Sequence, residues 1–145
     1  MTIKISYIAP LDSRPFKYAV KRINDRGNLN VNYEIFLFGE EIVNTIDAGE
    51  TPKSDIFMFP EIISWSRDSR NNRGSDKEPD VELAEYITGK KGYENSKVII
   101  LDHIISNPKS KKAAGAIPKL LTTSQPFDLQ LESIITEVLD QNYKN

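Results

Sequence analysis

The sequence contains no cysteine and a single histidine, His103, among its 145 residues. The lack of cysteine excludes disulfide bonds, thiolate metal sites and cysteine catalysis, and one histidine excludes a zinc site built from several histidines. No apolar run reaches the roughly 18 residues of a membrane-spanning helix, and the opening MTIKISYI is too short an apolar run for a signal peptide. We therefore expect a cytoplasmic protein without a membrane partner.

No charge of one sign dominates the chain. Nineteen lysines and arginines stand against 21 aspartates and glutamates, which gives a net charge of −2 with the histidine neutral. This balance provides no overall field that would attract nucleic acid or an anionic membrane. Apolar residues make up 39% of the chain and charged residues 28%, as in ordinary globular domains. The length fits one domain with a single core, residues 1–145.

Short apolar segments with the pattern of β-strands alternate with amphipathic segments of helical spacing. Residues 55–59 and 98–101 are nearly continuous apolar runs, as in parallel strands that are buried on both faces. The alternation predicts a parallel sheet with helices on both faces, joined by right-handed crossovers. The expected strands are residues 3–8, 31–38, 55–59, 98–101 and 120–121; the expected helices are residues 15–26, 40–48, one from 79, one ending near 116 and one from 128.

The last third of the chain has a recognisable order of elements. Ala113-Ala114-Gly115-Ala116 should close a helix, Leu120-Leu121 suits a short buried strand, and Gln125-Pro126-Phe127-Asp128 leads into the last helix. This order resembles the C-terminal third of bacterial response-regulator receiver domains, and the resemblance covers nearly the whole chain. It implies an α/β, flavodoxin-like fold, a three-layer sandwich with a five-stranded parallel sheet of order 2-1-3-4-5. It also implies a cis peptide bond between Gln125 and Pro126.

Receiver chemistry needs particular side chains at the carboxyl ends of the strands. In the family, two acids after the first strand and an aspartate after the third hold a magnesium ion, and that aspartate accepts the phosphoryl group. A serine or threonine after the fourth strand and a lysine after the fifth bind the phosphoryl oxygens. The matching positions here are Ala9, Pro10, Pro60, Asp102 and Gln125. All five differ from the family pattern, so the resemblance implies a pseudo-receiver, with the fold but without enzymatic activity, metal or cofactor.

Four polar residues just past the expected strands support a different hypothesis. Asp12, Glu61 and Asp102 could form a displaced acidic cluster that binds a metal or small ligand, with His103 as a general base. In the plainer interpretation the acids are helix caps and loop residues, and the histidine is a packed or capping side chain. We favour the plainer interpretation, because no nucleophile elbow, GxGxxG or P-loop motif is present.

The polar segment of residues 64–77 is a long loop for a compact domain. It contains a tryptophan and three interleaved arginines: Trp65, Arg67, Arg70 and Arg73. These residue types are over-represented at the anchors of protein interfaces, and they can also stack on and pair with nucleic acid. Asp68 offsets part of the charge, so we expect a solvated or protein-binding loop rather than a nucleic-acid site.

Together these patterns favour a signalling or scaffold domain that binds another protein independently of phosphorylation. In the receiver family the fourth helix, fifth strand and fifth helix form the usual partner or dimer surface. The matching segments here are residues 110–116, 119–122 and 129–139, where Ala113 and Ala116 would allow close approach. We expect a protein partner, a homodimer or both at this face.

Overall fold

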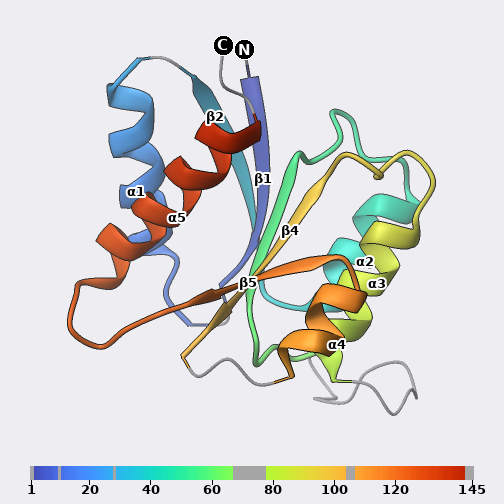
Figure 1. The fold of residues 1–145 in the computed structure, drawn as a ribbon. Coiled ribbons are helices and arrows are strands. Elements are labelled where there is room, and N and C mark those ends of the chain that lie inside the picture. Colours follow the sequence, from blue (N-terminus) through green and yellow to red (C-terminus); the bar gives the residue numbers. More distant parts are fainter. Residues whose placement is uncertain (1, 10, 28, 67–77, 104–106, 143–145) are drawn as a thin grey trace.

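The computed structural model describes residues 2–9, 11–27, 29–66, 78–103 and 107–142 of the chain (Figure 1). Within these residues, five strands and five helices alternate. The strands are β1 (Thr2–Ile8), β2 (Asn30–Phe36), β3 (Ile56–Pro60), β4 (Lys97–Asp102) and β5 (Ala116–Leu120). The helices are α1 (Arg14–Asp25), α2 (Gly39–Asp47), α3 (Pro79–Gly89), α4 (Pro108–Ala113) and α5 (Phe127–Asn142). All pairings between neighbouring strands are parallel, and the order β2-β1-β3-β4-β5 confirms the predicted flavodoxin-like sheet.

The helices divide between the two faces of the sheet. α1 and α5 lie side by side on one face, and α2, α3 and α4 cover the other (Figure 1). Each face has its own cluster of buried side chains, because successive residues of a strand point to opposite faces. Beneath α1, the ring of Phe16 stacks on Tyr7 of β1 with 4.2 Å between ring centroids. The core is therefore two layers of apolar contacts separated by the sheet.

The central strands follow the predicted pattern closely. Ile56 to Phe59 in β3 and Val98 to Leu101 in β4 are all buried, as their apolar runs predicted. In α1, Pro15 lies in the first turn, where a missing N–H costs nothing, and the apolar stripe beginning at Phe16 faces the core. The long apolar runs therefore position the sheet's carboxyl edge, where a site is expected in this fold.

The position of β5 differs from the prediction. The helix before it ends at Ala113, and Gly115 then takes a positive φ of 84°, which turns the chain directly into a strand at Ala116. β5 therefore begins four residues earlier than the expected buried Leu120-Leu121, and 53% of Leu120 is exposed. Pro118 is tolerated in this strand because β5 pairs on one side only, with β4.

The predicted cis bond between Gln125 and Pro126 is wrong. Among the described residues the one cis peptide bond joins Thr51 to Pro52. Because β5 ends at Leu120, Gln125 lies in an exposed turn five residues beyond the strand rather than at its end. The receiver pattern around Pro126 is therefore matched in sequence but not in its local structure.

Across the described residues, no helix combines the length and the apolar character that crossing a membrane requires.

Candidate functional site

The carboxyl ends of β1 and β3 present no polar side chain at the family's acidic positions. Ala9 follows β1, is 4% exposed, and donates its backbone N–H to the carbonyl of Phe36 at 2.9 Å. Pro60 is the last residue of β3. Pro10 lies outside the described residues. Neither alanine nor proline has a side-chain oxygen. The acids near the carboxyl ends of the strands therefore lie at positions other than the acidic positions of the family.

Asp102 supplies one of those acids. It ends β4 and its side chain is fully buried. Its Oδ2 accepts a hydrogen bond from the Nζ of Lys111 at 2.8 Å, while Oδ1 is buried without a hydrogen-bond partner in the described part of the chain. Burial raises the pKa of Asp102, the nearby Glu61 adds to this rise, and the hydrogen bond from Lys111 opposes it.

Lys111 reaches this carboxylate from α4. Its side chain is 3% exposed, and its Nζ also lies 3.5 Å from Oε2 of Glu61, which follows β3. Burial favours the neutral amine, but the hydrogen bond to Asp102 and the charges of Asp80 and Glu61 outweigh it and raise the pKa of Lys111. One ammonium therefore stays charged among several carboxyl groups.

Asp80, in the first turn of α3, is the third acid near Lys111. It is 2% exposed, and this burial raises its pKa to about 6, although backbone hydrogen bonds and the Lys111 charge act in the opposite direction. A pocket of about 240 Å³ opens beside it. The pocket is lined by Glu61, Ile62, Glu78, Asp80, Val81, Asn107 and Lys111.

The remaining residues of the predicted crevice lie on the surface. Asp12 is exposed and bound by its neighbour Arg14, and the hydrogen bonds from Arg14 hold the pKa of Asp12 below its usual value. His103 is exposed directly after β4. Within the described ranges, no three acidic or histidine side chains are grouped to hold a metal ion. The structure thus brings Glu61 and Asp102 together around an ammonium.

Trp65 is not an exposed contact residue. Only 6% of it is exposed, because its ring packs against α2 in the second core cluster. The fit is close: a Cβ added to Gly39 would lie 3.1 Å from Cε3 of Trp65. The backbone is also held, since the N–H of Glu40 bonds the carbonyl of Trp65 at 2.9 Å. The expectation of an exposed aromatic is therefore wrong, and Arg67, Arg70 and Arg73 lie outside the described residues.

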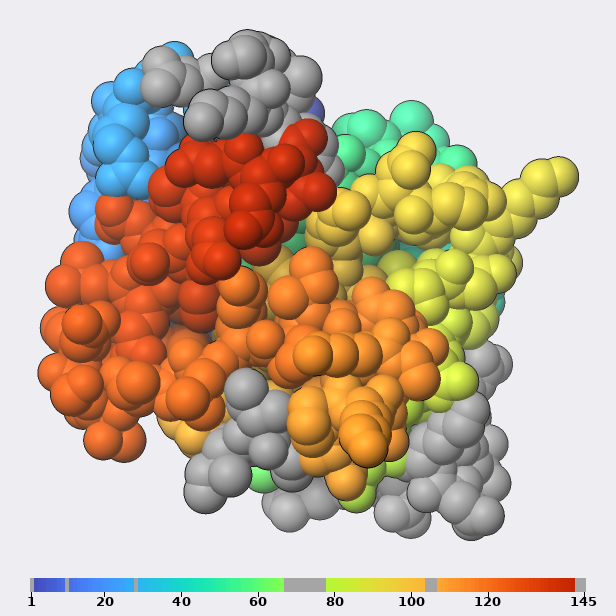
Figure 2. Space-filling model, viewed as in Figure 1, coloured from blue at the N-terminus to red at the C-terminus, as the bar shows by residue number. Residues whose placement is uncertain are grey.

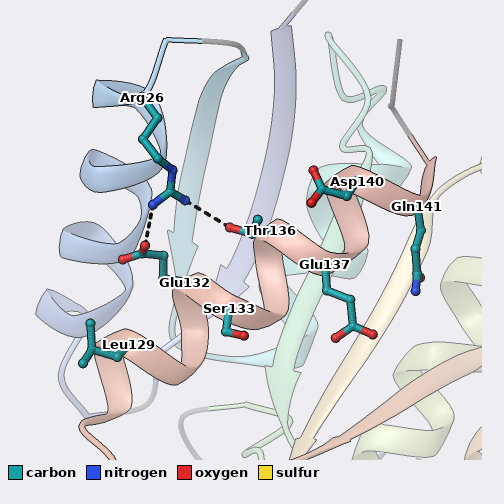
Figure 3. Close-up of a pocket in the computed structure, with 8 residues that line it drawn as sticks. All are labelled: Arg26, Leu129, Glu132, Ser133, Thr136, Glu137, Asp140 and Gln141. Atoms are coloured by element: carbon teal, nitrogen blue, oxygen red, sulfur yellow. Dashed lines mark hydrogen bonds and ion pairs between the residues drawn. The ribbon is translucent and has the colours of Figure 1, made fainter.

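The predicted partner face is only partly as expected. Ala113 is exposed on α4, but Ala116 is 4% exposed and its side chain cannot reach a partner. The outer side of α5 forms a shallow groove of about 610 Å³ (Figure 3). Its lining comes from α5 and from Arg26, which binds Glu132 and Thr136 across the gap between α1 and α5 (Figure 3).

Sequence reasoning missed Lys111 and Asp80. Lys111 stands among Lys109 and Lys112, and residue type alone does not separate the three. The available signal was spacing, because Lys111 precedes the buried Ala114 by three residues and so shares its face of the helix. Asp80 was missed because acids are common in the first turn of a helix, where they usually face solvent.

The sequence matches no known family model and no curated protein. Its structure is similar to several solved response regulators. The phosphorylated cyanobacterial phytochrome response regulator RcpA matches with a TM-score of 0.67 and 11% identity, over 99% of this chain and 95% of that one. The chemotaxis response regulator CheY4 of Vibrio cholerae matches with a TM-score of 0.64 and 15% identity, over 96% of this chain and all of that one.

The response regulator DrrB of Thermotoga maritima, an OmpR/PhoB homologue, matches with a TM-score of 0.61 and 16% identity over 97% of this chain. This chain spans about half of that protein, 54% of its length. At such low identity these likenesses concern the fold. The chain has the flavodoxin-like fold of response-regulator receiver domains.

Proposed function

We propose that this chain is a receiver-like signalling or scaffold domain that binds another protein and does not depend on phosphorylation. The observation that carries the proposal is Pro60, the residue at the end of β3 where a receiver has its phosphoacceptor aspartate. A proline side chain has no oxygen that could accept a phosphoryl group. In this proposal the chain is not an enzyme and uses no cofactor.

The other described phosphotransfer positions support the same conclusion. Ala9 cannot bind a metal through its side chain, and Gln125 is exposed in a turn beyond β5. Asp102 stands where a hydroxyl is needed, and its carboxylate already binds Lys111 at 2.8 Å. A phosphoryl group brought here would meet a buried carboxylate, whose negative charge would repel it.

The partner surface we propose is the face of α4, β5 and α5, which is seen from the front in Figure 2. Its two ends differ in charge. α4 exposes Lys109 and Lys112. α5 carries four acids and no basic residue, but three of the acids already bind cations: Asp128 binds Arg22, Glu132 binds Arg22 and Arg26, and Glu137 binds Lys119, while the fourth, Asp140, is exposed. Leu120 and Leu129 add apolar surface, with exposed fractions of 53% and 49%.

This composition fits a protein partner that offers apolar side chains flanked by charges of both signs. A second copy of this chain would meet that requirement if a two-fold axis near β5 brought the lysines of α4 opposite the exposed Asp140 of α5. A different protein with the same charge pattern would also fit. We therefore assign the face to protein binding and leave homodimer and heterocomplex as two outcomes of one test.

An amide NMR titration tests the phosphorylation-independent part of the proposal. Magnesium is added first, followed by beryllofluoride, which mimics a phosphoryl group. We expect no saturable shift at the amides of Ala9, Glu61 and Asp102, and no added phosphoryl mass after incubation with a small phosphodonor. A stable phosphoaspartate contradicts the proposal, and saturable shifts at these amides favour the alternative, a crevice that binds a metal or small ligand.

A further inference from the structure

The helix α4 is held to the molecule in an unusual way. Of its six residues, Lys111 is the one with a buried side chain, and the other five are exposed. A helix of this kind normally rests on a stripe of apolar side chains. Here the side chain that enters the interior ends in an ammonium, and that ammonium is bound to Asp102 at 2.8 Å and lies 3.5 Å from Glu61.

The rest of α4 contributes little to hold it in place. Six residues are too few to be stable as an isolated helix. Its N-cap residue, Asn107, has a φ of 50° and makes no side-chain capping hydrogen bond. In the part of the chain that the structure describes, its other fixed contacts are at the C-terminal end: Ala114 is buried, and its carbonyl accepts a hydrogen bond from Oγ1 of Thr88 at 2.8 Å.

The ion pair lies in an environment with an excess of carboxyl groups. Lys111 is faced by Asp102 from β4, by Glu61 from the loop after β3 and by Asp80 from α3. A buried ion pair loses much of its stabilisation when one partner changes charge, because the other is then left in the interior without compensation. The attachment of α4 is therefore sensitive to the charge of this crevice.

We propose that the Lys111–Asp102 ion pair is a latch that fastens α4 to the carboxyl edge of the sheet, so that the charge of the crevice controls the position of α4. Opening of the latch frees α4 while its C-terminal end stays attached at Ala114. The consequence for binding rests on the function proposed above, since α4 carries Lys109 and Lys112 of the partner face.

Hydrogen exchange of the α4 amides tests the latch directly. The variants are Lys111→Met, which keeps the apolar stem and removes the charge, and Asp102→Asn, which keeps the size and an acceptor oxygen. Lys112→Met is the matched control, because Lys112 is an exposed lysine of the same helix. We expect the amides of residues 111–114 to be accelerated at least ten-fold more than the amides of α5 in both latch variants, with no such difference in the control.

Two results overturn the latch. One is exchange of the α4 amides in Lys111→Met and Asp102→Asn within two-fold of the unmodified chain. The other is an equal acceleration at every amide, which would mean that the pair stabilises the whole fold rather than α4. If Lys111→Met fails to fold, Asp102→Asn decides between these outcomes.

Hydrogen exchange needs no partner, so the latch and the proposed function can fail separately. A protected α4 in the variants removes the latch and leaves protein binding at the α4, β5 and α5 face intact. A freed α4 whose release changes neither self-association nor the binding of a partner removes the proposed control of that face and leaves the latch.

Discussion

Two buried charge clusters lie at opposite ends of the strands, one at the amino ends (the amino edge) and one at the carboxyl ends (the carboxyl edge). They differ in how completely their charged groups are paired. At the amino edge, the carboxylate of Glu50 accepts hydrogen bonds from the backbone N–H and Oγ of Ser54 and from the hydroxyl of Tyr93, and it binds the ammonium of Lys4 at 3.0 Å. Burial favours the neutral form of Glu50, but these donors outweigh it and lower its pKa.

At the carboxyl edge, burial outweighs the hydrogen bonds and the cation that would keep the carboxyl groups charged. Lys111 is a single ammonium among the carboxyl groups of Asp102, Glu61 and Asp80, and Oδ1 of Asp102 lacks a partner in the described part of the chain. The pKa of Asp102 and that of Asp80 are raised, mainly by burial. A fully paired network stabilises one arrangement, whereas an incompletely paired one can respond to ligands and protons. The amino-edge cluster is therefore the more completely paired of the two, and the carboxyl-edge cluster is the one on which the proposed latch depends.

The largest effect is expected at Glu50. Glu50→Ala leaves the hydroxyl of Tyr93 without its buried acceptor, while Lys4 keeps Glu34 and the carbonyl of Pro52. We therefore expect a loss of roughly 3 kcal/mol of unfolding free energy, the lower end of the cost of breaking a buried ion pair. Urea denaturation measures the loss. The matched control is Glu34→Ala, because Glu34 binds the same ammonium at 2.9 Å with 47% of its side chain exposed. We expect about 1 kcal/mol or less for Glu34. Equal losses for the two variants would show that burial does not distinguish the contacts.

A smaller loss is expected at Lys111. Lys111→Met leaves Asp102 as a buried acid without its cation, but that acid can become neutral by taking up a proton, because its pKa is already raised. We expect roughly 2–3 kcal/mol of destabilisation near pH 8 and less near pH 5. The sign follows because a raised pKa in the folded state favours folding at low pH, and this contribution is lost as the pH rises. Urea curves at both pH values check the expectation, and a loss independent of pH contradicts it.

At Asp80 we expect a substitution to stabilise the fold, whereas the substitutions at Glu50 and Lys111 destabilise it. Its pKa of about 6 in the folded state exceeds its ordinary value of 3.8, so the folded protein binds a proton that the unfolded chain has released between these pH values. Stability from this group is complete below about pH 3.8 and is lost as the pH rises through about 6. Above about pH 6 the buried carboxylate is charged, and keeping it charged in the interior costs at most roughly 3 kcal/mol of unfolding free energy. Asp80→Asn removes this cost.

Because the asparagine also gives up the charged form's backbone hydrogen bonds, we expect a gain of about 1–2 kcal/mol at pH 7.5 and little change at pH 4. Thermal unfolding at the two pH values measures it. Glu78→Gln, at the exposed N-cap of the same helix, should change stability by about 0.5 kcal/mol or less. A variant Asp80→Asn that is less stable at pH 7.5 would show that Asp80 stabilises the fold.

The contrast between the two edges also explains what the sequence could predict. The sheet order and the two central strands follow from apolar runs such as residues 98–101, because burial on both faces leaves a pattern in sequence. The pairing of Lys111 with Asp102 leaves only the three-residue spacing between Lys111 and Ala114, which is a weak signal because a lysine on a short helix ordinarily faces solvent. For Trp65 the error was the opposite one, because a buried residue was predicted to be exposed. Its polar neighbours indicated a surface loop, and the close contact with Gly39 that buries its ring forms only in the folded chain.

The smallest effect on stability, and the one aimed at binding, is expected at Leu129. It is 49% exposed on α5, so Leu129→Glu should change the free energy of unfolding by about 0.5 kcal/mol or less. Leu11→Glu is the matched control, because Leu11 is 96% exposed in the loop after β1 and outside the α4, β5 and α5 face. If that face binds protein, a buried glutamate weakens self-association or partner binding at least ten-fold for Leu129→Glu only. Sedimentation and quantitative partner binding measure these affinities. If the two variants bind equally well, the interaction surface does not include α5 at Leu129.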